Sequence, residues 1–218
     1  TPKFAFSAGI ATSAAPGSDG VRLTHRADAA LYWAKRHGRT DVQVFDPARH
    51  GAVGDERSTE ELADAVSRVA SERSLRPVYQ PIFSLTSGMP VGFEGLVRPM
   101  PGSGFDNAGS LFTAAEIADR IVELDMAAIE TIAARVEALQ PGQYLSLNLS
   151  PRTLETEQFH VGELIGIMRR YGLRPDQVVV ELTEREAIED LARLRANLDR
   201  VRAAGFRIAA DDVGAGNA

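Results

Sequence analysis

Hydrophobic residues along the chain follow two different spacings, and their order predicts strands that alternate with helices. An apolar strand over residues 4–11 is followed by residues 23–37, whose apolar side chains recur at helical spacing, and by a short strand over residues 42–45. At Ser58 a helix-capping sequence opens a new periodic stretch. The predicted divisions are a strand-helix-strand piece (1–46), a linker of small and turn-forming residues (47–57) and a second domain (58–218).

Within the second domain, strand-like runs alternate with long amphipathic stretches. Such alternation is typical of βα units, which build a parallel sheet. The pattern therefore predicts an α/β fold whose larger part is a partial (β/α)₈ TIM-like barrel. The predicted strands are 78–85, 91–97, 144–149, 178–183 and 207–211, and the predicted longer helices are 113–139, 153–171 and 185–204.

Polar residues interrupt these apolar strands near their C-terminal ends. Glu94, Asn148 and Glu181 lie late in three successive strands, and Asp211 and Asp212 close the last one. The steps from Asn148 to Glu181 and from Glu181 to Asp211 are each about 30 residues, the length of one βα unit. Because the C-terminal ends of barrel strands meet at one mouth, we expect these side chains to lie close together.

The chemistry of this set favours a divalent cation. Carboxylates in apolar strands are costly to bury unless they are paired or bound to a metal. The chain has only two lysines, Lys3 and Lys35, so no lysine accompanies the set. All-oxygen ligands point to Mg²⁺ or Mn²⁺. Two adjacent aspartates, Asp211 and Asp212, also suit a pair of ions, as in phosphodiester hydrolysis.

Each of these residues has a plainer explanation when it is taken alone. Glu94 could be an edge or salt-bridged residue, Asn148 could start a turn, and Asp211 with Asp212 could cap a helix. The shared position at the ends of successive strands is what favours the metal site. The four histidines do not join the set and are interpreted as surface or structural residues: His25, His37, His50 and His160.

Composition narrows the classes of function. With 30 acidic and 24 basic residues, the net charge is −6, which argues against a binder of nucleic-acid polymers or anionic membranes. Hydrophobic residues make up 44%, an ordinary value for a globular protein. Cysteine is absent, which excludes disulfides and thiolate zinc sites and fits a cytoplasmic location. No apolar run is long enough for a membrane span, so we expect membrane attachment only through segments outside this chain.

Both ends of the chain suggest an interior piece of a longer protein. It begins without Met inside a predicted strand and stops at Ala218, shortly after another strand. A half barrel would leave the outer edge of its last strand unpaired. We therefore expect either a longer polypeptide or a second chain that completes the sheet.

Five motifs follow one another along the second domain: Tyr79-Gln80-Pro81-Ile82, Glu94-Gly95-Leu96-Val97-Arg98, Asn148-Leu149-Ser150-Pro151, Glu181-Leu182-Thr183-Glu184 and Asp211-Asp212-Val213-Gly214-Ala215-Gly216. Together they resemble the first half of an EAL domain, the cyclic di-GMP phosphodiesterase module. The N-terminal piece contains Ser7-Ala8-Gly9-Ile10-Ala11 and Ala27-Asp28-Ala29-Ala30-Leu31-Tyr32-Trp33-Ala34-Lys35, followed by Gly38-Arg39. These segments are similar to the end of a GGDEF diguanylate cyclase domain, which implies a tandem GGDEF–EAL protein.

The resemblance implies roles for these residues. It implies hydrolysis of cyclic di-GMP to linear pGpG with two Mg²⁺ or Mn²⁺ ions, cyclic di-GMP as the ligand, and a homodimer as a further assembly. The family's catalytic lysine belongs to a later strand, beyond Ala218, so no catalytic residue is expected within the chain. The implied metal ligands are Glu94, Asn148, Glu181 and Asp211, with Asp212 on a second ion, and the implied dinucleotide contacts are Gln80 and Arg98.

Three functions remain open from the sequence. The first is a cyclic di-GMP hydrolase, and the second is a receptor that binds the dinucleotide without cleaving it. The third is another metal-dependent barrel, such as an enolase-like enzyme with a lysine base. Asn148 among the ligands and the lack of any lysine after Lys35 weigh against this third function. One departure from the family signature is Gly95, where Ala is usual, and we expect this exchange of small residues to be tolerated.

Overall fold

The structure is a computed structural model, and it describes residues 6–12, 20–36, 42–46, 59–136, 139–183, 188 and 190–211. The chain divides into two compact units, Thr1–Leu62 and Ala63–Ala218. The predicted linker, residues 47–57, lies outside the described residues. No helix among the described residues combines the length and the apolar character needed to cross a bilayer.

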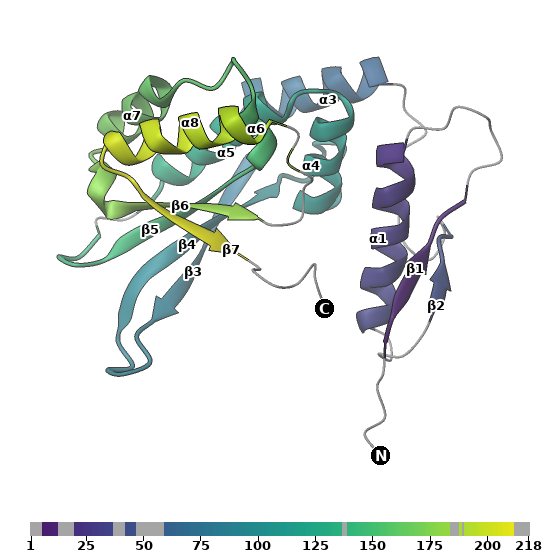
Figure 1. Cartoon of the computed structure of the whole chain (residues 1–218), viewed down its shortest axis with the longest axis horizontal. Coiled ribbons are helices and arrows are strands. Elements are labelled where there is room, and N and C mark those ends of the chain that lie inside the picture. Colours follow the sequence, from purple (N-terminus) through teal and green to yellow (C-terminus); the bar gives the residue numbers. More distant parts are fainter. Residues whose placement is uncertain are drawn as a thin grey trace. The chain divides into compact units, whose positions relative to one another are not determined.

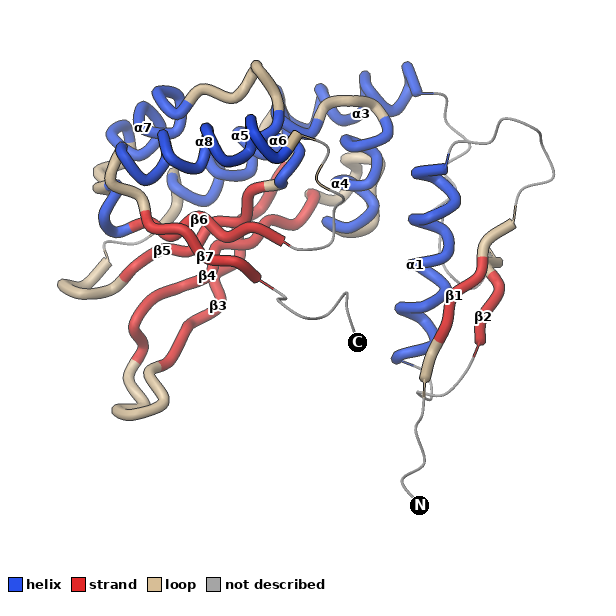
Figure 2. The backbone as a smooth tube through the Cα atoms, in the orientation of Figure 1, coloured by secondary structure: helices blue, strands red, loops and turns tan. Residues whose placement is uncertain are grey.

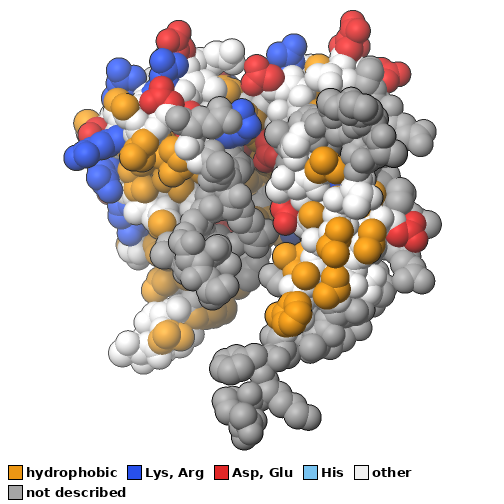
Figure 3. Space-filling view, turned by 45° about the vertical axis from the view of Figure 1, so that its right-hand side comes forward, with side chains coloured by type: hydrophobic (Ala, Val, Ile, Leu, Met, Phe, Trp, Pro, Cys, Tyr) orange, Lys and Arg blue, Asp and Glu red, His pale blue; other side chains and the backbone are white. Residues whose placement is uncertain are grey.

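The first unit contains the strand-helix-strand arrangement expected within residues 1–46. Strand β1 (Ala8–Ile10) pairs in parallel with β2 (Val42–Val44), and helix α1 (Gly20–Arg36) connects them. The helix packs closely on β1, because a Cβ atom at Gly9 would lie 1.9 Å from the carbonyl oxygen of Ala27. Hydrophobic side chains gather on one surface of this unit (Figure 3), and the exposed ones include Phe6, Ile10, Val42 and Val44.

The second unit is built on one five-stranded sheet in the order β3-β4-β5-β6-β7 (Figure 1). Neighbouring strands from β4 to β7 are parallel, as the alternation of strands and helices predicts. Strand β3 instead pairs antiparallel with β4, since the connection of six residues between them is a hairpin. The strand bounds are β3 (Leu75–Phe83), β4 (Pro90–Pro99), β5 (Tyr144–Leu149), β6 (Val178–Thr183) and β7 (Arg207–Asp211).

Helices α5, α7 and α8 lie along one side of this sheet (Figure 2). The predicted strands 144–149, 178–183 and 207–211 match the observed bounds. The predicted helices 113–139 and 153–171 are wrong, because each is broken into two. The helix bounds are α3 (Thr59–Ser71), α4 (Ala108–Ile117), α5 (Ile121–Ala133), α6 (Pro151–Glu155), α7 (Val161–Arg170), the 3₁₀ turn η1 (Pro175–Gln177) and α8 (Leu191–Ala203).

Local backbone geometry explains both breaks. Between α4 and α5, Asp119 adopts a left-handed conformation with φ of 53°, which ends the first helix. Between α6 and α7, Thr156 is extended, and the connection buries Phe159, which is 3% exposed. Neither break coincides with a glycine or proline, so the amphipathic pattern alone predicted continuous helices.

Alternation along the strands separates an apolar face from a polar face. Leu145, Leu147 and Leu149 of β5 are all at most 1% exposed and form the core under the helices. Residues between them, Ser146 and Asn148, point to the opposite face of the sheet. The hydrophobic core therefore lies on the helical side, and the predicted ligands lie on the other side.

This α/β sheet agrees with part of a barrel, but it is not closed. Among the described residues β7 pairs only with β6, and β3 pairs only with β4. The prediction of a partial barrel therefore holds only at the coarser level of an α/β fold with an open sheet.

Candidate metal and substrate site

Strand register brings three of the predicted ligands onto one face of the sheet. Glu94 of β4 lies opposite Ser146 of β5, and two residues further along β5, Asn148 lies opposite Glu181 of β6. Directly paired residues project from the same face, as do residues two apart in one strand. Glu94, Asn148 and Glu181 therefore share the face away from the helices, as their positions in the sequence predict.

A side-chain hydrogen bond joins the first two of these residues. The amide nitrogen Nδ2 of Asn148 donates to Oε1 of Glu94 over 2.9 Å. Both side chains are half-buried. Because the nitrogen of the amide faces Glu94, its oxygen Oδ1 is directed elsewhere, and this oxygen is the atom that a hard cation binds.

Glu181 and Asp211 occupy the next two strands. Glu181 is half-buried and makes interactions of its own. Asp211 is the last residue of β7 and pairs in register with Thr183, at the C-terminal end of β6. The side chain of Asp211 and the whole of Asp212 lie outside the described residues. The structure thus places the backbone of the predicted fourth ligand at the same end of the sheet.

Ser146 is a polar neighbour of the site that the sequence did not single out. It is fully buried, and its hydroxyl has no hydrogen-bond partner among the described residues. It lies between Glu94, its register partner, and Asn148, two residues along the strand. A buried hydroxyl without a partner is costly, and a bound water or ion would satisfy it. The sequence indicates Ser146 only through its small polar side chain between two leucines of the strand.

The described donors fit a hard divalent cation. Two carboxylates, an amide and a hydroxyl supply oxygen atoms only, which suits Mg²⁺, Mn²⁺ or Ca²⁺ rather than zinc. No three histidine or acidic side chains come close enough to hold a metal within the described part of the chain. A group of three such side chains is not expected here, because only two of the predicted carboxylate ligands, Glu94 and Glu181, have described side chains.

The predicted dinucleotide contacts flank the ligands on β3 and β4. Gln80 is exposed and lies directly opposite Glu94 in the hairpin, so the two side chains share one face. Arg98 is exposed near the C-terminal end of β4, and its Nη1 donates to the carbonyl oxygen of Val97 over 2.9 Å. The register therefore brings Gln80 beside the predicted metal ligands, while Arg98 lies further along β4, on the C-terminal side of Glu94.

Helix α5 supports the hairpin that carries these contacts. Tyr79, the neighbour of Gln80, donates its hydroxyl to the carbonyl oxygen of Ile132 over 2.7 Å. Burial raises the pKa of Tyr79 to about 12, against a smaller lowering by the charge of Arg135. The phenol is therefore a neutral donor at physiological pH, and it fixes β3 to the helical layer.

Gly95 allows the same helix to approach β4. A Cβ atom at this position would lie 2.4 Å from Cγ2 of Ile132 and 3.4 Å from Cδ2 of Leu147. In this chain an alanine at position 95 would require Ile132 to move.

Comparison with known proteins gives one family match. The family model of the EAL domain matches residues 60–218. Across 214 residues the chain is 26% identical to the bifunctional diguanylate cyclase/cyclic di-GMP phosphodiesterase MucR of Pseudomonas aeruginosa, covering 96% of this chain and 31% of MucR. It is 27% identical to the signaling protein YkoW of Bacillus subtilis, covering 97% of this chain and 26% of YkoW. The chain therefore spans about a third or less of these relatives.

A solved structure shows a similar arrangement of the backbone. The calcium and cyclic di-GMP complex of Klebsiella pneumoniae BlrP1 superimposes with a TM-score of 0.57 at 31% sequence identity. This similarity covers 66% of the present chain and 36% of BlrP1. About two thirds of this chain therefore has a backbone similar to part of a larger protein that was solved in complex with calcium and a cyclic dinucleotide.

Proposed function

Because this chain belongs to the EAL domain family, we propose that it is part of a metal-dependent phosphodiesterase that hydrolyses cyclic di-GMP to linear pGpG in signal transduction. One observation carries this proposal. Glu94, Asn148 and Glu181 share one face of three adjacent parallel strands, and the first two are joined by a 2.9 Å hydrogen bond. Such an array of oxygen donors suits a cation that activates water against a phosphodiester.

Mg²⁺ or Mn²⁺ is the proposed cofactor, and two ions are proposed. Glu94, Asn148, Glu181 and Asp211 would hold the first ion, and Asp212 would contact the second. The calcium in the BlrP1 complex supports a divalent cation beside the dinucleotide. When bound, such ions lower the pKa of a ligating water and neutralise charge on the phosphate.

The residues of this chain prepare the site in two ways. Glu94 holds the amide of Asn148 in one orientation, which fixes the position of its oxygen before any ion binds. Gln80 and Arg98 are proposed to bind the dinucleotide, with Arg98 donating to a phosphate oxygen. The guanidinium of Arg98 is exposed, so its remaining N–H groups can turn toward a ligand while Nη1 stays on its own strand.

The first unit is proposed to be the end of a GGDEF domain, which gives a tandem GGDEF–EAL arrangement. Its parallel β1–β2 pair with a connecting helix has the topology of an α/β domain, and its exposed apolar residues suit a larger sheet. MucR, a bifunctional diguanylate cyclase and cyclic di-GMP phosphodiesterase, combines the same pair of activities. A cytoplasmic location for this portion and a homodimer are further parts of the proposal.

Turnover by the full-length protein tests the proposed function. Purified protein is incubated with cyclic di-GMP in the presence of Mg²⁺, of Mn²⁺ or of a chelator, and products are separated by chromatography. We expect linear pGpG only when a metal is present. Tight binding of cyclic di-GMP without cleavage would assign the receptor function instead, and neither binding nor cleavage would contradict both functions.

A further inference from the structure

A buried carboxylate lies directly behind the strand end that carries Asn148. Asp125 of α5 is only 2% exposed and lies among mostly apolar neighbours along the helix, so it is a charged group within the core. Its Oδ2 accepts one hydrogen bond from the backbone N–H of Ser150 over 3.1 Å and another from the hydroxyl of Thr153 over 2.5 Å. Burial of a carboxylate is costly, so these charge-assisted bonds are needed to stabilise it.

Both donors belong to the turn that follows Asn148. Strand β5 ends at Leu149 and helix α6 begins at Pro151, so Ser150 alone makes the connection. Ser150 is also the N-cap of α6, because its side chain accepts from the N–H of Arg152 over 3.2 Å. The N–H of Ser150 has no carbonyl partner within α6, because it precedes the first turn of that helix. Ser150 is 8% exposed, so without Asp125 this N–H would be a buried, unsatisfied donor.

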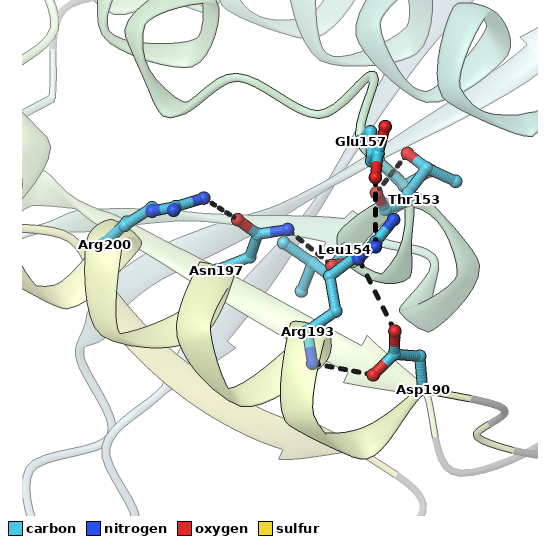
Figure 4. A network of polar contacts seen from close by, with 8 residues as sticks. Thr153, Leu154, Glu157, Asp190, Arg193, Asn197 and Arg200 are labelled. Carbon is cyan, nitrogen blue, oxygen red and sulfur yellow. Dashed lines mark hydrogen bonds and ion pairs between the residues drawn. The ribbon is translucent and has the colours of Figure 1, made fainter.

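Helix α6 is held from its other side by a separate contact. Asn197 of α8, also 2% exposed, donates Nδ2 to the carbonyl oxygen of Leu154 over 2.7 Å and accepts from Arg200 (Figure 4). This contact acts at the far end of α6 and does not involve Ser150. The two buried polar residues therefore restrain the same short helix at two different points, Asn197 at its far end and Asp125 at the end next to Asn148.

We propose that Asp125 is a positioning residue for the metal site. By holding the N–H of Ser150, it fixes the backbone two residues after Asn148 and so the position of the amide oxygen relative to Glu94 and Glu181. This inference rests on the proposed function for the identity of the bound group, a divalent cation. Partners that orient metal ligands from outside typically affect metal affinity by about 10-fold to 100-fold when they are removed.

Calorimetric titration of the full-length protein with Mn²⁺, without substrate, tests this role. We expect Asp125→Ala to weaken Mn²⁺ binding about tenfold or more. Asp125→Asn should show a smaller loss, since both bonds go to a single oxygen that an amide also provides. The matched control is Asn197→Ala, which removes an equally buried contact to the same helix and should lower the melting temperature without changing Mn²⁺ affinity.

Several results would overturn the inference. Unchanged Mn²⁺ affinity in a folded Asp125→Ala protein would do so, and so would an equal loss in Asn197→Ala. If Asp125→Ala does not fold, Asp125→Asn takes its place, because it removes the charge that strengthens the bond from the N–H of Ser150, and unchanged affinity there has the same meaning. If the wild type binds Mn²⁺ and the variants differ as expected but cyclic di-GMP is not cleaved, the positioning role stands and the proposed activity alone fails.

Discussion

At the residue scale, hydrogen bonds restrain the side chains and backbone around the proposed metal site. The hydrogen bond between Asn148 and Glu94 and the bonds from Ser150 and Thr153 to Asp125 form two such restraints on either side of one strand end. The first could be anticipated from the sequence, because both residues lie late in predicted strands. Asp125 could not, since one acidic residue in an amphipathic helix is ordinarily solvent-exposed and its burial depends on tertiary packing.

Substitution of Glu94 tests the predicted ligand set. We expect Glu94→Ala to lower turnover of the full-length protein by more than about 100-fold, because it removes a ligand and frees the amide of Asn148 to rotate. The fold should survive, since loss of one anion relieves repulsion among the carboxylates. Turnover and thermal melting are measured together, with the exposed Glu163→Ala on α7 as control. Activity near the wild-type level would remove Glu94 from the set.

Substitution of Arg98 tests its predicted contact with a phosphate. We expect Arg98→Ala to weaken cyclic di-GMP binding about tenfold, the equivalent of one charge-assisted hydrogen bond. This loss should shrink as salt is added, since screening weakens the contact in the wild type. The control is Arg76→Ala, because Arg76 is the exposed register partner of Arg98 on β3. Equal affinities of Arg98→Ala and wild type at low salt would exclude the contact.

Gly95 stands where alanine is usual in the family, and the sequence predicted that this exchange is tolerated. The structure gives Gly95 a specific packing role beside Ile132. We expect Gly95→Ala to lower the free energy of unfolding by about 1–3 kcal/mol, because the new methyl group would overlap Ile132. In an Ile132→Ala background the same change should cost less. Chemical denaturation measures both, and Gly166→Ala, in open space on α7, serves as the control. Equal costs in the two backgrounds would contradict the packing role.

At the scale of elements, strands were predicted better than helices. The three strands β5, β6 and β7 match their predicted bounds, because apolar runs flanked by polar breaks leave little choice of register. The helices predicted over 113–139 and 153–171 were wrong, since the left-handed residue Asp119 and the buried Phe159 interrupt them without a glycine or proline signal. The antiparallel hairpin of β3 and β4 could have been predicted, because six residues are too few for a parallel crossover.

Three helical segments are joined by one carboxylate, Glu130 of α5. It pairs with Arg73, just after α3, over 2.9 Å, and it accepts from the hydroxyl of Tyr171, just after α7, over 3.1 Å. Arg170 of α7 is a further ion-pair partner. Burial alone would raise the pKa of Glu130, but the bonds from Arg73 and Tyr171 outweigh it and hold the pKa below its usual value.

The pH dependence of stability tests this link. Because the pKa of Glu130 is lower in the folded state, its contribution is complete above the unfolded value of about 4.3 and is lost as the pH falls through the folded value. We expect Glu130→Gln to be less stable by about 1 kcal/mol at neutral pH, with the difference disappearing in more acidic solution. Denaturation curves at several pH values measure this. A difference that keeps its neutral-pH size, or grows, down to a pH of about 2 would contradict the ion-pair account.

At the scale of the whole molecule, the sequence predicted the class of fold and the polar face of the sheet. The rest of the predicted ligand set lies outside the described residues. Alternating strands and helices predicted the α/β sheet, and the positions of Glu94, Asn148 and Glu181 late in their strands predicted their common face. Asp212 and the side chain of Asp211 are outside the described part of the chain. Their roles, and the identities of the metal ligands, stay predictions.

The most direct test of this account is to locate the metal. Crystals of the full-length protein grown with Mn²⁺ are measured for anomalous scattering, which reveals manganese independently of any fitted atoms. We predict an anomalous peak about 2.0–2.4 Å from oxygen atoms of Glu94, Asn148 and Glu181, on the face of the sheet away from the helices. A bound Mn²⁺ ion elsewhere, or saturating Mn²⁺ with no peak among these three side chains, would contradict the proposed metal site.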